Sequence, residues 1–160
     1  VRELRDKTGA GIMDCKRALE ETDGDIAKAE AILNKKGLAS AAKKAGRSTS
    51  EGLVVSYIHT GGRVGSMIEL NCETDFVART DEFEVLGRNL AMQIAAMSPR
   101  FVDRDSVPED AEEVKDEELL LEQEYIRDSS MKIADLVADS IGKLGENIHI
   151  RRFSRFELGG

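Results

Sequence analysis

Apolar residues recur at helical spacing in three stretches of the first forty residues. These stretches cover residues 1–7, residues 12–21 and a segment that begins after Asp25 and ends at Gly37. Spacings of three and four residues place the apolar side chains on one face of each predicted helix. Asp25 suits the N-cap of the third helix, and Gly37 suits the residue just beyond its end. We therefore expect residues 1–40 to form a small three-helix bundle.

Residues 38–50 separate this bundle from the rest of the chain. They are rich in Ala, Ser and Lys and end in the polar run Gly46-Arg47-Ser48-Thr49-Ser50. Clusters of Gly, Ser and Thr between periodic segments are typical of loops. The composition predicts a short helix that continues into a linker at residues 41–50, followed by a second domain at residues 51–160.

The apolar period changes from helical to alternating after residue 50. Residues 53–59 and 64–72 predict two strands, and Gly61-Gly62 between them predicts a hairpin. Residues 147–158 predict a third strand. Its alternation breaks near Phe153, which indicates a β-bulge or a change of register.

Two longer helices are predicted within the second domain. One covers residues 81–97 after the N-cap Thr80, and the other covers residues 132–144 after a cap at Ser129 or Ser130. The predicted order is strand, strand, helix, helix, strand. This order indicates an α+β fold, in which a small antiparallel three-stranded sheet carries helices packed on one face.

Charge is unevenly distributed along the chain. The net charge is −8, which argues against general binding of nucleic acids. Residues 1–50 nevertheless hold 11 basic and 8 acidic side chains, whereas residues 103–124 hold 2 basic and 11 acidic ones. Such an acidic stretch is typical of a solvated linker or helix surface. No apolar run approaches the ~20 residues that span a membrane, so we expect no membrane contact. Because of the negative net charge we also expect no direct DNA binding.

Two basic tracts could contact the phosphates of RNA. They are Lys35, Lys36, Lys43, Lys44 and Arg47, and Arg151, Arg152 and Arg155. No aromatic residue interleaves with the first tract, which weakens a model in which bases stack on the protein. We favour the interpretation that these side chains are ordinary surface charges, at a helix C-terminus and along a solvated edge, over RNA contacts. A ribosome- or RNA-associated binding module is the alternative.

Catalytic chemistry finds little support in the sequence. Cys72, His59 and Asp75 could supply a thiol nucleophile, its base and an orienting group. His59 and Cys72 lie at opposite ends of the predicted hairpin, however, too far apart for a hydrogen bond. Cys15 and Cys72 belong to no metal-binding spacing, and Gly9-Ala10-Gly11 lacks the residues of a phosphate loop. We expect neither an enzyme nor a protein with a cofactor or metal of its own.

The segment Glu73-Thr74-Asp75-Phe76-Val77-Ala78-Arg79-Thr80-Asp81 joins the second strand to the first long helix. Thr74 and Thr80 can each cap a helical turn, so we expect a short turn to begin at Asp75. Phe76 is then either exposed on this turn or packed back onto the following helix. Apolar periodicity alone favours the packed position.

Residues 8–16 read Thr-Gly-Ala-Gly-Ile-Met-Asp-Cys-Lys, and residues 69–79 read Glu-Leu-Asn-Cys-Glu-Thr-Asp-Phe-Val-Ala-Arg. These stretches closely resemble the two hallmark motifs of the elongation factor Ts family. Gly145-Glu146-Asn147-Ile148 and Arg151-Arg152-Phe153 are also similar to that family. The resemblance covers nearly the whole chain in the right order.

The resemblance implies a fold, a partner and an activity. It implies that the N-terminal module is like a ubiquitin-associated bundle and that an α+β core follows it. The implied partner is elongation factor Tu, a GTPase. The chain is then expected to be a guanine-nucleotide exchange factor in translation elongation, which promotes GDP release by displacing Mg²⁺ and allows exchange to GTP.

The resemblance also assigns residues to two contact sites. One site dislodges the partner's Mg²⁺ and inserts its Phe between side chains of the partner, which reverses the prediction from periodicity for Phe76. The other site docks the N-terminal module on the partner's nucleotide-binding domain. The implied residues are Thr74, Asp75, Phe76 and Val77 for the first site and Gly11, Ile12, Met13, Asp14 and Lys16 for the second.

The chain departs from the family pattern in two ways. The segment between Val107-Pro108-Glu109 and Leu120-Leu121-Glu122-Gln123 is shorter than in most short members, which leaves the packing of the central helices open. Long members carry two copies of the core, whereas this chain has one, as short members do. Short members can compensate by pairing two chains. We expect a homodimer, in the cytoplasm or, after removal of a transit peptide, in the plastid stroma.

Overall fold

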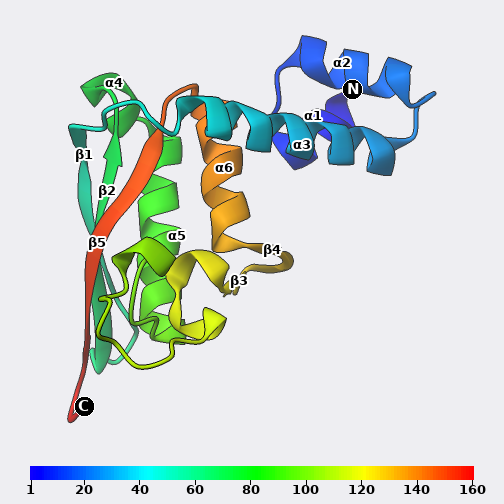
Figure 1. Cartoon of the computed structure of the whole chain (residues 1–160). Helices are drawn as coiled ribbons and strands as arrows, with labels where there is room; N and C mark the ends of the chain where they lie inside the picture. Colours follow the sequence, from blue (N-terminus) through cyan, green and yellow to red (C-terminus); the bar gives the residue numbers. More distant parts are fainter.

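Three helices form the N-terminal unit in the computed structural model, which describes residues 1–160 (Figure 1). They are α1 (Arg2–Thr8), α2 (Ile12–Glu21) and α3 (Ile26–Lys44). Their apolar faces meet in a small buried cluster made of Leu4, Cys15, Ala18, Ala29 and Leu33. The predicted N-cap of α3 is confirmed, because the Asp25 carboxylate accepts a hydrogen bond from the backbone N–H of Lys28. The three predicted helices are therefore present.

The third helix is longer than its sequence predicts. It continues through Gly37 and ends at Lys44, so the prediction that Gly37 terminates it was wrong. Gly37 instead lies close to Gly142 of α6 (Ile133–Leu144). A Cβ built on Gly142 would be 3.4 Å from the Gly37 Cα. A Cβ built on Gly37 would meet no atom within 4 Å, so the residue whose Cβ would reach the other helix at this crossing is Gly142. Gly37 thus lies inside α3, next to its crossing with α6, and not at a helix end.

The sheet has three antiparallel strands in the order β1-β2-β5. The strands are β1 (Glu51–Ile58), β2 (Val64–Cys72) and β5 (Ile148–Glu157). The register of β2 with β5 shifts between Glu69 and Leu70, which pair with Arg152 and Ile150 and leave Arg151 as the extra residue. The bulge expected in the last strand is therefore present, two residues before Phe153.

Helix α5 (Asp81–Met97) and helix α6 close the core on one face of this sheet (Figure 1). The N-cap prediction for α5 is confirmed, because Thr80 accepts a hydrogen bond from the backbone N–H of Phe83. A cluster of 17 buried residues from the sheet, α5, α6 and neighbouring turns forms the main core. The α+β fold with helices on one face agrees with the sequence analysis.

The segment after α5 contains structure that the sequence analysis did not predict. It has three short 3₁₀ turns, η1 (Arg104–Ser106), η2 (Asp116–Glu118) and η3 (Leu120–Glu122), and a small second sheet of β3 (Glu124–Tyr125) and β4 (Asp128–Lys132). The predicted serine cap of α6 was wrong, since Ser129 and Ser130 lie in β4. The carboxylate of Asp135 instead accepts from the Lys132 backbone N–H. None of the helices is both long and apolar enough to cross a membrane.

Candidate functional site

A single helical turn, α4 (Asp75–Ala78), stands between β2 and α5. Thr74 begins it, because its hydroxyl oxygen accepts a hydrogen bond from the Val77 backbone N–H at 3.4 Å. Thr80 follows it, and its hydroxyl donates to the Val77 carbonyl oxygen at 2.7 Å while accepting from the Phe83 N–H at 3.2 Å. Side-chain caps therefore fix the turn at both ends.

The turn separates two apolar inner residues from an exposed aromatic one. Ala78 is buried and Val77 packs against the main core, whereas 80% of the Phe76 surface is exposed. The prediction from periodicity that Phe76 packs back onto the next helix was wrong. The chain changes direction between Arg79 and α5, so the helical period does not continue from α4 into α5. A single exposed apolar side chain is common on protein surfaces, so it is the position of Phe76 on a capped turn, and not its exposure alone, that makes this turn a candidate contact site.

Charged side chains flank Phe76 on the same turn. Asp75 forms an ion pair with Arg79 at 3.1 Å, and both side chains are at least half exposed. Exposed pairs of this kind contribute little to stability. The Asp75 carboxylate can therefore exchange this partner for another group at little energetic cost.

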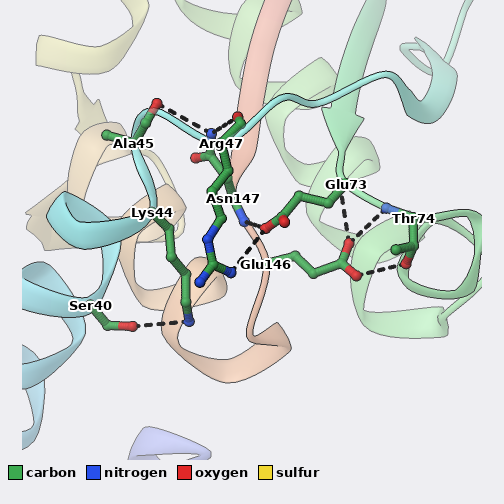
Figure 2. Close-up of polar contacts among 8 residues, drawn as sticks. All are labelled: Ser40, Lys44, Ala45, Arg47, Glu73, Thr74, Glu146 and Asn147. Atoms are coloured by element: carbon green, nitrogen blue, oxygen red, sulfur yellow. Dashed lines mark hydrogen bonds and ion pairs between the residues drawn. The ribbon is translucent and has the colours of Figure 1, made fainter.

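The base of α4 is held by residues from a distant part of the chain. Glu146 and Asn147, in the connection between α6 and β5, hydrogen-bond to the segment Glu73–Thr74 just before the turn (Figure 2). Neither Glu146 nor Asn147 was predicted to have a role at this site. The only signal was their place in the motif Gly145-Glu146-Asn147-Ile148, which resembles the same family as the turn does.

The predicted N-terminal contact residues lie at the start of α2. Gly11 is its N-cap, and Ile12 and Met13 are 54% and 63% exposed. The Asp14 carboxylate accepts from the Lys36 ammonium at 2.6 Å, and this hydrogen bond lowers the Asp14 pKa below its usual value. Lys16 is exposed and lies 4.0 Å from Glu20. The start of α2 thus presents two apolar side chains beside an ion pair.

Helix α3 lies between the two groups of predicted site residues. Helix α2 packs beside the N-terminal part of α3, whereas α4 lies near the start of β1, beyond the C-terminal end of α3 (Figure 1). The structure does not bring Phe76 together with Ile12 or Met13. The two surfaces are separate contact regions on one framework.

The thiol site considered for Cys72 does not form. Cys72 pairs with Glu51 at one end of the hairpin, whereas the His59 N–H donates to Val64 at the other end. The Cys72 thiol is buried and donates to the Thr74 carbonyl oxygen at 3.2 Å. Burial, reinforced by the Glu146 carboxylate, raises its pKa to about 11. A thiol that stays protonated at neutral pH is a poor nucleophile.

Most side chains of the two basic tracts have partners within the chain. Lys36 binds Asp14, Lys44 donates to Ser40, and Arg47 lies 3.6 Å from a Glu73 carboxylate oxygen. In the second tract both Arg151 and Arg152 pair with Glu69, and Arg155 donates to the Ala95 carbonyl oxygen. These contacts favour surface charge over an RNA-binding site. No group of three or more His, Cys, Asp or Glu side chains is arranged to hold a metal ion.

Comparisons with known proteins agree on one family. The family model described as "Elongation factor TS" matches residues 37–125. The elongation factor Ts of Anaeromyxobacter sp. (strain K) is 50% identical over 189 aligned positions, which cover 99% of this chain and 86% of that protein. The elongation factor Ts of Thermotoga neapolitana is 49% identical over 187 positions, which cover 99% of this chain and 95% of the relative.

These alignments are longer than the chain itself. They extend over 187 or 189 positions, whereas the chain has 160 residues. The relatives therefore have residues that this chain lacks. The alignments give no position for these residues, so the shortened segment between residues 109 and 120 stays a prediction.

Proposed function

The chain belongs to the elongation factor Ts family, and we propose that it is a guanine-nucleotide exchange factor for elongation factor Tu. It promotes release of GDP by displacing the partner's Mg²⁺ and so permits exchange to GTP. The observation that carries this proposal is Phe76, which stands exposed on a turn capped at both ends within the segment that resembles the family motif.

An exchange factor of this kind acts by binding and forms no covalent bond. It binds the nucleotide-free partner more tightly than the nucleotide-bound one, and by linkage it weakens nucleotide binding by the same factor. A shift of about 10⁴-fold requires roughly 5.5 kcal/mol of differential binding. Complete burial of one Phe side chain supplies about 1.5–3 kcal/mol. Phe76 therefore needs contributions from other contact surfaces.

The two contact regions divide this work. Phe76 acts as a wedge between side chains of the partner, and the half-exposed Asp75 carboxylate is carried to the same place. The residues assigned to Mg²⁺ displacement are Thr74, Asp75, Phe76 and Val77. The start of α2 docks on the partner's nucleotide-binding domain through Gly11, Ile12, Met13, Asp14 and Lys16. Loss of Mg²⁺ exposes phosphate charge that the metal had neutralised, which favours departure of the nucleotide.

The test is the release of labelled GDP from elongation factor Tu with and without this chain. We expect acceleration by the wild type and a loss of about tenfold or more with Phe76→Ala, since the apolar contact at the tip is removed. Asp75→Ala should be less impaired. Val85→Ala is the matched control, because Val85 is also exposed, at 54%, but lies on α5. If Phe76→Ala releases GDP at the wild-type rate, the wedge has no role.

The division of the chain into functional units is part of the same proposal. Residues 1–40 form the docking module, which resembles a ubiquitin-associated bundle, residues 41–50 form the linker, and residues 51–160 form the core. Helix α3 crosses the first of these boundaries, which ties the module to the linker without a flexible joint. As a translation factor it works in the cytoplasm, or in the plastid stroma if it comes from a plastid.

We also propose that two chains pair through the outer face of the sheet. The register places Val54 and Ile58 of β1, Met67 of β2 and Phe156 of β5 on the face away from α5, and all four are more than half exposed. Figure 1 shows no helix over this side of the sheet. A sheet face with several large apolar residues is typical of an interface. A second copy fits this face because it presents the same apolar residues.

Sedimentation measures this pairing directly. The wild type should sediment as a dimer at working concentration, and Met67→Asp should sediment as a monomer because a carboxylate in the centre of the interface lacks a partner. A monomeric profile of the wild type would contradict the homodimer.

A further inference from the structure

Three separate segments of the chain meet at the base of α4 (Figure 2). They are the part of the linker that follows the end of α3, the residues between β2 and α4, and the connection between α6 and β5. Two carboxylates and one side-chain amide join them. These three groups belong to Glu73, Glu146 and Asn147.

The Glu146 carboxylate uses both of its oxygens on the residues that precede α4. One oxygen accepts from the backbone N–H groups of Glu73 and Thr74, at 3.1 and 2.9 Å. The other accepts from the Thr74 hydroxyl at 2.6 Å. A carboxylate is the side chain best suited to three donors, since both of its oxygens only accept. Hydrogen bonds to a charged acceptor are also stronger than neutral ones.

The bond to the Thr74 hydroxyl decides how that hydroxyl caps the turn. Because its proton points to Glu146, its lone pairs remain for the Val77 backbone N–H. A helical segment of four residues is not stable by itself and depends on such caps. Phe76 is 80% exposed and has little packing of its own, so the backbone of α4 sets its direction. Glu146 therefore acts on Phe76 through Thr74.

The neighbouring residue extends the same arrangement to the linker. The Asn147 backbone N–H donates to the Glu73 carboxylate at 2.6 Å, and its buried side-chain amide donates to the carbonyl oxygens of Ala45 and Arg47 at 3.4 and 2.9 Å. Arg47 also lies 3.6 Å from the Glu73 carboxylate. The linker and the turn are thus fixed to the same two residues after α6.

We propose that Glu146 is a positioning residue for nucleotide exchange, which holds the Thr74–Val77 turn in the orientation that projects Phe76 toward the partner. This inference rests on the proposed function. Glu146 itself does not touch the partner. Glu146 orders the turn before the partner binds, so the free-energy cost of ordering the turn does not weaken binding.

The test uses the full chain as wild type, Glu146→Ala, Phe76→Ala and the double variant. We expect Glu146→Ala to lower the maximal rate of GDP release by about tenfold, because bonds to a charged acceptor are lost. The concentration needed for half-maximal rate should change little, since the start of α2 is intact. Glu146→Gln keeps one acceptor oxygen and should fall between wild type and Glu146→Ala. Glu122→Ala is the matched control, since its carboxylate pairs with Lys132 away from the turn.

Two further readouts separate positioning from a general loss of stability. The double variant should be no slower than Phe76→Ala, because Glu146 acts only through the turn that carries Phe76. Amide hydrogen exchange at Thr74 and Val77 should accelerate in Glu146→Ala while that of α5 stays unchanged. This second readout requires no partner and also applies to Glu146→Gln.

Failure of this inference differs from failure of the proposed function. If the wild type does not accelerate GDP release, the exchange function is wrong, and hydrogen exchange still tests the support of the turn. If Phe76→Ala is impaired but Glu146→Ala matches the wild type, only the positioning role is wrong. Additive losses in the double variant, or unchanged exchange at Thr74 and Val77, would also overturn it.

Discussion

The N-terminal helical unit and the α+β core support their exposed contact residues in different ways. The helical unit rests on a cluster of five buried side chains, whereas the core rests on a cluster of 17. Ile12 and Met13 stand on the smaller unit. Phe76 stands on a turn that two threonine caps and Glu146 hold against the larger one.

This difference places one group of contact residues on a unit with a small core and the other on a turn held by several hydrogen bonds. A unit with so few buried residues is marginal by itself, and it depends on its contact with α6. That contact includes the close approach of Gly37 in α3 to Gly142 in α6. It also includes Lys143, which lies so close to Gly9 that a Cβ built on Gly9 would be 2.6 Å from the Lys143 Cε. Under the proposed function, we infer that the helical unit supplies affinity for the partner, while the turn that carries Phe76 disrupts the partner's nucleotide-binding site.

The largest expected effect comes from weakening the smaller core. Leu4→Ala and Leu90→Ala each remove a fully buried leucine, one from each cluster, at a cost of about 2–5 kcal/mol. Leu4→Ala should unfold the helical unit alone, because its cluster is too small to absorb the loss. A thiol reagent should then modify Cys15 quickly while Cys72 stays protected. Simultaneous modification of both cysteines would mean that the two regions unfold together and would remove the contrast.

The next effect separates affinity from rate. Changing Ile12 and Met13 together to Ala should raise the concentration for half-maximal GDP release by about tenfold, through lost apolar contact, and leave the maximal rate unchanged. Phe76→Ala should mainly lower the maximal rate. Leu38→Ala, which removes another half-exposed apolar side chain from the helical unit, is the control. The division of work would be wrong if both sets of variants changed the same kinetic parameter.

The smallest effect concerns the pH dependence of the larger core. The pKa of Cys72 is raised to about 11 from 9.0, so the folded state favours the protonated thiol. This contribution to the free energy of unfolding is complete below pH 9.0 and is lost as the pH rises toward about 11. Denaturant titrations should show a larger fall for the wild type than for Cys72→Ala over this interval. Equal falls for the two proteins would show that Cys72 does not couple to folding.

Local sequence signals predicted most of the fold. Threonine and aspartate caps, the Gly61-Gly62 turn and the alternating strands each depend on neighbouring residues, and the structure contains the elements that they predict. The end of α3 was missed because the helix continues past Gly37 to pack Ala41 against the main core, whose residues lie far away in the sequence. The segment between α5 and α6 was missed because acidic residues and short turns carry no clear apolar period.

The candidate site was only partly predictable for the same physical reason. The caps Thr74 and Thr80 predict the turn, but the direction of Phe76 depends on how the chain runs from the turn into α5. Glu146 and Asn147 lie 72 to 74 residues from the groups they bind before α4. No periodicity or spacing can connect residues so distant. Only the folded chain shows that the motif Gly145-Glu146-Asn147-Ile148 and the turn belong together.

Because α3 is one continuous helix, it also fixes the rotation of α1 and α2 about the α3 axis relative to the core. An α-helix advances ~1.5 Å and turns ~100° per residue, so its 19 residues extend over roughly 28 Å. One residue inserted between Leu33 and Gly37 would rotate α1 and α2 by about 100° around the helix axis and turn Ile12 and Met13 away from their present direction. An insertion of four residues, slightly more than one turn, would bring that direction back to within about 40° and shift it by ~6 Å. The helical phase of α3 therefore sets the direction in which the docking surface faces, and length variation in this helix should occur in whole turns.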